Sequence, residues 1–188
     1  MIIWIDPSSS NIWLCIINEN DPKPILLTSF KWKSTLTKDP RIIKMVQELE
    51  MIIKDYLDES TIVFVEYPVV FRNAKWSLVV AESLGFVKKM LYDIWVNTIH
   101  ELNVMHIKSI VWKSKKEHLV ALVNNVFESK QRKLPKNDHE CDAYLIALAG
   151  LKRYYNSKIA DDIFTHKPRS GQVDTGTYTL VCKTTLWN

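Results

Sequence analysis

The chain has 188 residues, of which 47% are hydrophobic and 24% are charged, and its formal net charge is +4. These values predict one folded domain with a full core and exclude an intrinsically disordered chain. No apolar run reaches the length of a membrane span, and Asp6 interrupts the first apolar run, so we expect no secretory signal. The three cysteines are widely spaced and fit no zinc or disulfide framework, which favours a reducing, cytoplasmic location.

Apolar runs separated by turn residues predict the secondary structure. Strands are expected at residues 2–5, 11–18, 25–32, 61–65 and 103–107. Helices are expected at residues 37–57, 75–102, 114–127 and 138–155. The first three strands are joined by short turns, so they should form an antiparallel meander with the first strand in the centre. This order predicts an α/β fold, in which helices cover the faces of a mixed sheet.

Acidic residues stand where two predicted strands end and where the last helix begins. Asp6 follows the first strand and Glu66 follows the fourth, so the two carboxylates lie side by side if these strands are adjacent and parallel. The last helix opens with Asp138, His139 and Asp142, whose spacings of three and four place them on one face. Taken alone, these acids are most simply a helix cap. Convergence with Asp6 and Glu66 would instead create a site for Mg²⁺ or Mn²⁺, because clustered carboxylates repel unless a cation lies between them.

Basic residues are concentrated before the last predicted helix, in two groups: Lys108, Lys113, Lys115 and Lys116, then Lys130, Arg132, Lys133 and Lys136. One interpretation is a surface that holds a polyanion beside a metal, and the other is a solvated lysine face. A pair of ions about 3.5–4 Å apart, flanked by such a surface, would suit phosphodiester hydrolysis.

Six segments match one family in order and spacing. They are Ile-Ile-Trp-Ile-Asp-Pro-Ser at 2–8, Ile-Val-Phe-Val-Glu at 62–66, Phe-Arg-Asn-Ala-Lys at 71–75, Val-Met-His-Ile-Lys at 104–108, Lys-Lys-Glu-His-Leu-Val at 115–120 and Asp-His-Glu-Cys-Asp-Ala at 138–143. Over about residues 1–150 the chain therefore resembles the RuvC-type Holliday junction resolvases of the RNase H-like superfamily. One departure is the turn after the first acid, where the family's Asp-x-Gly is Asp6-Pro7-Ser8.

The resemblance implies an RNase H-like five-stranded mixed sheet over residues 1–156. Residues 157–188 have no counterpart in the family and are expected to form a C-terminal extension, in which residues 175–187 have the character of edge strands. It implies Asp6, Glu66, His139 and Asp142 as metal ligands and catalytic residues, with Asp138 as the alternate ligand. Mg²⁺ is the implied metal, and Mn²⁺ should also support activity. Lys116 is implied as a further catalytic residue. The implied DNA-binding residues are Phe71, which is preferred over Tyr67 as the stacking aromatic, with Arg72, Lys75, Lys108, Lys113, Lys115 and Lys116.

The implied function is a structure-specific endodeoxyribonuclease that resolves four-way DNA junctions by paired metal-dependent hydrolysis. The implied assembly is a homodimer, which the extensive apolar spacing of residues 76–99 also favours. Alternatives are a nuclease for other branched DNA or for RNA–DNA hybrids, and a non-catalytic junction-binding protein. A sugar-kinase or actin-type ATPase would need glycine-rich phosphate loops, which 4 Gly can hardly supply. The abundance of Ile, Lys and Asn is compatible with an AT-rich genome and so with a phage or viral resolvase, which would act in the host cytoplasm.

Overall fold

The computed structural model describes residues 1–32, 37–67, 74–96, 98–103 and 138–155. The helix expected at 114–127 and the extension expected at 157–188 lie outside the described residues. Within the described part, no helix is long and apolar enough to cross a membrane.

One mixed sheet of five strands organises the described chain. Its strands are β1 (Ile2–Pro7), β2 (Asn11–Asn18), β3 (Asp21–Lys31), β4 (Ile62–Tyr67) and β5 (Ile99–Asn103), in the spatial order β3-β2-β1-β4-β5. β1 pairs antiparallel with β2 and parallel with β4, and β2 pairs antiparallel with β3. The meander and the central position of the first strand are therefore confirmed. β4 continues through Glu66, which lies within the strand.

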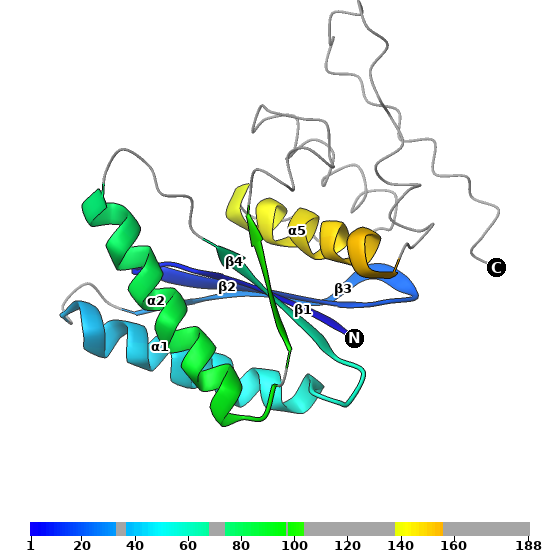
Figure 1. The fold of residues 1–188 in the computed structure, drawn as a ribbon, viewed down its shortest axis with the longest axis horizontal. Helices are drawn as coiled ribbons and strands as arrows, with labels where there is room; N and C mark the ends of the chain where they lie inside the picture. The colour runs from blue at the N-terminus through cyan, green and yellow to red at the C-terminus, as the bar shows by residue number, and fades with distance from the viewer. Residues whose placement is uncertain (33–36, 68–73, 97, 104–137, 156–188) are drawn as a thin grey trace, which may run out of the picture.

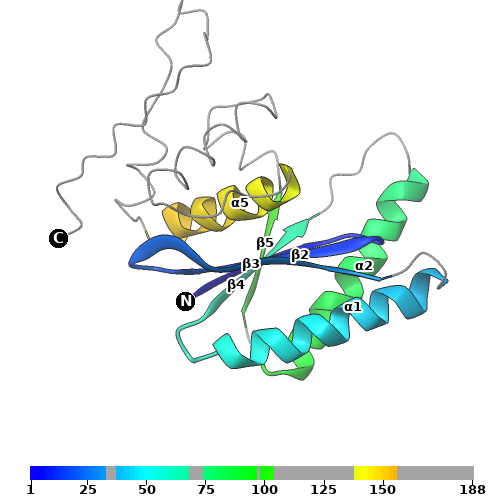
Figure 2. The ribbon, with the colours of Figure 1, turned by 180° about the vertical axis from the view of Figure 1, so that it is seen from behind.

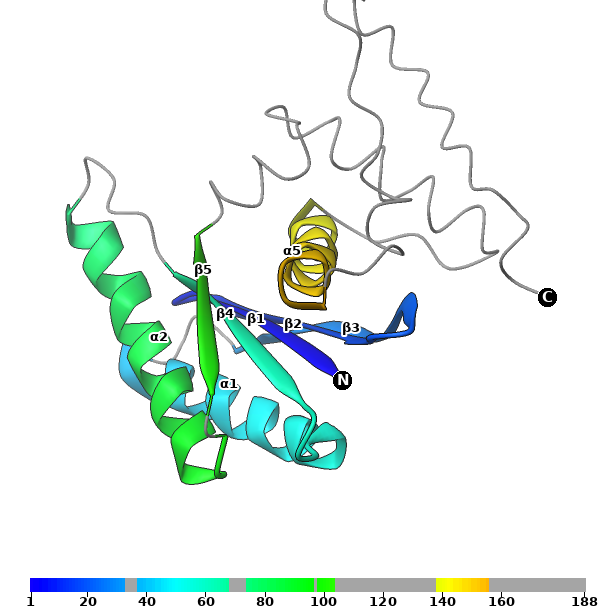
Figure 3. The same ribbon diagram turned by 45° about the vertical axis from the view of Figure 1, so that its right-hand side comes forward.

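Helices cover both faces of the sheet (Figures 1 and 3). Helix α1 (Lys38–Ile53), extended by a short 3₁₀ turn (Lys54–Tyr56), packs with α2 (Ala74–Asp93) on one face. Helix α5 (Asp138–Tyr155) packs on the other face and begins and ends where the sequence predicts. Strand residues alternate between the two layers: Trp4 and Phe64 lie under α5, while Ile5 and Val65 lie under α1 and α2.

The predicted end of the second helix is wrong, and so is the predicted place of the fifth strand. Helix α2 ends at Asp93 instead of 102, and β5 (Ile99–Asn103) begins at Ile99 instead of 103, while residues 104–107 lie outside the described residues. The cause is Trp95, which has a positive φ of 66°. The Trp95 N–H donates to the Tyr92 carbonyl and the Val96 N–H donates to the Leu91 carbonyl, so the helix closes in a Schellman motif without glycine.

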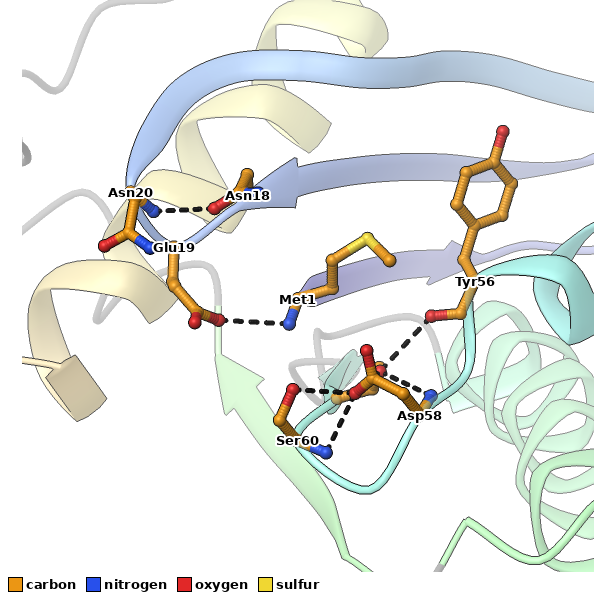
Figure 4. Close-up of polar contacts among 8 residues, drawn as sticks. Met1, Asn18, Glu19, Asn20, Tyr56, Asp58 and Ser60 are labelled. Atoms are coloured by element: carbon orange, nitrogen blue, oxygen red, sulfur yellow. Dashed lines mark hydrogen bonds and ion pairs between the residues drawn. The ribbon is translucent and has the colours of Figure 1, made fainter.

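The end of the sheet at which β1 and β4 begin is held by loop contacts (Figure 4). The N-terminal ammonium group of Met1 forms an ion pair with Glu19 at 3.1 Å. In the loop before β4, Asp58 accepts hydrogen bonds from the Ser60 and Thr61 hydroxyls at 2.7 and 2.9 Å. These contacts hold the beginnings of β1 and β4 in place. Asp6 and Glu66 lie towards the other end of these two strands.

Candidate active site

Asp6 and Glu66 are neighbours on the two central parallel strands. The parallel pairing of β1 with β4 ends at Ile5 and Val65, and Asp6 and Glu66 are the next residues on the two strands. Neighbouring strands lie about 4.8 Å apart. Both acidic residues are half-buried. The first two predicted acids therefore lie side by side where β1 and β4 end.

The alternation of side chains directs both acids towards the α5 layer. Residues two apart on a strand share a face, and Trp4 and Phe64, two residues before the acids, are buried against α5. Trp13, the cross-strand partner of Asp6 on β2, belongs to the same layer. The acids are thus on the face that α5 covers.

The third acid, Asp142, lies early in α5. It is half-buried between Cys141 and Ala143, which are both buried against the sheet. Figures 1 and 2 show the beginning of α5 (yellow) at the end of the sheet where β4 and β5 finish, and its last turn (orange) towards β3. Helix α5 therefore carries Asp142 on the same face as Asp6 and Glu66, at the end of the sheet where β4 finishes.

Asp138 and His139 occupy the first turn of α5, four and three residues before Asp142. On a helix these spacings share one side. Their side chains lie outside the part of the structure that is described, so their roles as ligands stay predictions. Lys75 lies in the first turn of α2, and its side chain is also outside the described part of the structure. The other predicted DNA-binding and catalytic residues lie outside the described residues: Phe71, Arg72, Lys108, Lys113, Lys115 and Lys116.

The carboxylate oxygens of Asp6, Glu66 and Asp142 suit a hard divalent cation, because Mg²⁺ and Mn²⁺ prefer carboxylate oxygens. Asp6, Glu66 and Asp142 each also interact with other parts of the protein. Among the described residues, no group of three or more His, Cys, Asp or Glu side chains could hold a metal ion. Asp6, Glu66 and Asp142 are described residues, so they do not form such a group by themselves, and the metal centre stays a prediction.

The turn that follows Asp6 is closed by a serine in place of the family's glycine. The Ser8 N–H donates to the Asn11 carbonyl at 2.9 Å, and the Ser8 hydroxyl donates to the same oxygen at 2.7 Å. The Ser8 hydroxyl oxygen also accepts the Asn11 N–H at 3.1 Å. These bonds shape the turn without requiring a positive φ.

Sequence reasoning missed Ser83, which ties this turn to α2. The Ser83 side chain is fully buried, and its hydroxyl donates to the Ser8 carbonyl at 3.0 Å. Beside it on α2, Glu82 forms an ion pair with Lys38 of α1. A serine inside an apolar helix is a weak signal, since its partner lies 75 residues away in the sequence.

The order of the five strands and the helices on both faces of the sheet define an RNase H-like fold. No protein-family model and no curated protein matches the chain by sequence. Among solved structures, Thermus thermophilus RuvC in complex with a Holliday junction substrate aligns with a TM-score of 0.68 at 18% identity, covering 82% of this chain and 94% of that one. A second Thermus thermophilus RuvC structure aligns with a TM-score of 0.65 at 17% identity, covering 82% and 96%.

The chain therefore has the fold of RuvC, and the predicted resemblance is confirmed at the level of the fold. The RNase H-like mixed five-stranded sheet flanked by helices is confirmed as well.

Proposed function

We propose that the protein is a metal-dependent endonuclease that resolves four-way DNA junctions by hydrolysing phosphodiester bonds in two strands. One observation supports this proposal: Asp6 and Glu66 each follow the last pair of the parallel β1–β4 pairing, on the face of a RuvC fold that α5 covers. One RuvC structure that is similar to this chain is a complex with a Holliday junction.

In this proposal Asp6, Glu66 and Asp142 hold Mg²⁺ or Mn²⁺, together with His139 or, as the alternate, Asp138. The bound metal would activate the attacking water and stabilise the leaving oxygen. The chain's part is to fix the positions of these groups. The strands supply two rigid carboxylates, and the turn closed by Ser8 and Ser83 holds the segment after Asp6. Lys116 would stabilise negative charge on the phosphate that reacts.

A cleavage assay tests the proposal. Wild-type protein, Asp6→Asn and the control Asp93→Asn are incubated with a synthetic four-way junction and Mg²⁺ or Mn²⁺. Asp93 is an exposed acid on α2 whose ion pair with Lys89 is also exposed, so the control removes a carboxylate that lies outside the proposed site. We expect Asp6→Asn to lose at least about 100-fold in rate, since the loss of a residue that only supports a metal ligand already costs about 10–100-fold. Absence of cleavage by the wild type with either metal would contradict the proposal.

A substrate panel separates this function from its alternatives. Flaps, Y-forks and RNA–DNA hybrids are offered beside the junction at equal concentration. Preferential cleavage of a hybrid or a flap would support the nuclease activity and would replace the four-way junction as the proposed substrate. Tight junction binding without cleavage would instead indicate a non-catalytic junction-binding protein.

We also propose that the protein acts as a homodimer, because two symmetric sites suit two symmetric strands of a junction. Leu78 of α2 is 69% exposed, which leaves a large apolar side chain for a partner to cover. Light scattering should report a dimer for the wild type and a monomer for Leu78→Lys. Met51 of α1 is 67% exposed, so Met51→Lys is a matched control that should remain dimeric. A monomeric wild type would refute this assembly.

A further inference from the structure

Lys31 lies at the same end and on the same face of the sheet as the acids. Asp6 pairs with Trp13, and Trp13 pairs with Ser29, so these residues form one row across β1, β2 and β3. Lys31 is two residues beyond Ser29, in the direction in which β1 ends. Since residues two apart share a face, Ser29 and Lys31 lie on the face of Trp13, which is the α5 face.

An aromatic ring positions the ammonium group of Lys31. Its Nζ atom lies 5.5 Å from the centroid of the Trp13 ring. The ring itself is only 3% exposed, whereas Lys31 is exposed. A cation over a buried indole is attracted to the ring face. The ammonium group of Lys31 therefore lies over Trp13, which pairs with Asp6, and the Lys31 side chain remains exposed to solvent.

Among the described residues, no acid neutralises the charge of Lys31. Other lysines with described side chains form ion pairs with carboxylates: Lys38, Lys54, Lys88 and Lys89. In the same part of the structure no carboxylate pairs with Lys31. Lys44 of α1 is the matched case on the other face of the sheet, because its Nζ lies 5.9 Å from the centroid of the Trp32 ring.

We propose that Lys31 binds a backbone phosphate of the DNA strand that lies across Asp6 and Glu66, and that Trp13 sets the position of its ammonium group. This inference rests on the proposed function. Two strand spacings and two residues along β3 put the Cα atoms of Lys31 and Asp6 roughly 12 Å apart. At that separation Lys31 contacts a phosphate that neighbours the reacting one, so its role is binding and alignment of the strand.

The test measures junction binding without cleavage. In an Asp6→Asn background, the dissociation constant of a fluorescent four-way junction is measured between about 50 and 200 mM salt. Lys31→Met should weaken binding by about 5- to 10-fold and lower the slope of log affinity against log salt by about 0.9 for each Lys31 that contacts a phosphate. Lys31→Arg should restore the slope, because it keeps the charge. Lys44→Met should leave both quantities unchanged.

Each outcome decides one claim. If Lys31→Met behaves like Lys44→Met while the background protein binds the junction with its usual salt dependence, the inference is overturned and the proposed function stands. If the background protein does not bind the junction, the proposed function fails and the role of Lys31 fails with it. Equal melting temperatures for the two methionine variants would show that the difference in binding is not a folding defect.

Discussion

At Gly150 helix α5 packs closely against the sheet, and this position offers a direct test of that packing. A Cβ atom at this position would lie 2.9 Å from one carbon of the Phe64 ring and 3.1 Å from two others. Phe64 is fully buried on β4, two residues before Glu66. Gly85 of α2 is the matched control, because a Cβ there would meet no atom within 4 Å.

The magnitude follows from two opposing effects. Replacing glycine by alanine inside a helix gains about 1 kcal/mol at either position. Nothing opposes this gain at Gly85, so Gly85→Ala should raise the free energy of unfolding by about 1 kcal/mol. At Gly150 the extra carbon overpacks a close-packed layer, which costs about 1–3 kcal/mol. Because the helix gain cancels between the variants, Gly150→Ala should be less stable than Gly85→Ala by about 1–3 kcal/mol.

Urea and thermal denaturation measure this difference. For a chain of this length 1 kcal/mol shifts the melting temperature by about 2–4 °C, so the two variants should differ by about 2–12 °C. Phe64→Leu combined with Gly150→Ala should show a coupling energy of about 0.5 kcal/mol or more, because the smaller side chain makes room for the new methyl group. If Gly150→Ala were as stable as Gly85→Ala, α5 would not rest on Phe64, and the placement of Asp142 on this face would lose its support.

Three further changes test the end of α2, the turn after Asp6 and the loop before β4. Trp95→Gly should raise the free energy of unfolding by about 0.5–1 kcal/mol in urea denaturation, because glycine adopts the positive φ without a Cβ clash and the indole is 86% exposed. Ser83→Ala should lower that free energy by about 1–2 kcal/mol, because the Ser8 carbonyl loses its donor. Hydroxyl hydrogen bonds, first from Ser60 and then from Thr61, hold the pKa of Asp58 below its usual range. The stability that Asp58→Ala removes should therefore be fully present above about pH 4 and disappear as the pH falls through the lowered pKa, as denaturation across pH would show.

Each of these changes has its own contrary result. An unchanged or lower stability of Trp95→Gly would mean that the indole stabilises the corner by more than the strain costs. Ser10 is an exposed residue in the same turn, so Ser10→Ala should change the free energy of unfolding by less than about 0.5 kcal/mol. If Ser10→Ala lowered it as much as Ser83→Ala does, the hydrogen bond from α2 would not be what stabilises the turn. A stability difference for Asp58→Ala that stayed constant into acid would refute the pKa argument.

The sequence predicts most of this fold because its elements are bounded by clear signals. Short β-branched runs end in turn residues, and the acids at the start of α5 mark that boundary correctly. The short turns on either side of β2 predict the meander, and β1 becomes central in the sheet because its other edge pairs with β4. The end of α2 is missed because no glycine marks it and because the apolar pattern continues through Ile94 and Val96 into β5.

The candidate site is predicted in part for a similar reason. Asp6 and Glu66 stand out because each breaks an apolar run. Lys31 does not stand out, since a lysine in an alternating strand has the pattern of a solvent-facing residue. Only the pairing of β3 with β2 brings its ammonium group over Trp13, and that pairing is a long-range property of the sheet.

The turn after Asp6 shows how a departure from a family pattern is compensated. Glycine in a turn supplies backbone freedom, whereas the Ser8 side chain forms hydrogen bonds that close the turn. The Ser83 hydroxyl of α2 donates a further hydrogen bond to the Ser8 carbonyl. The position of Asp6 therefore depends on α2 as well as on β1. For this reason Ser83→Ala, which removes no acid, should also weaken Mn²⁺ binding in titration calorimetry, while Ser10→Ala should not.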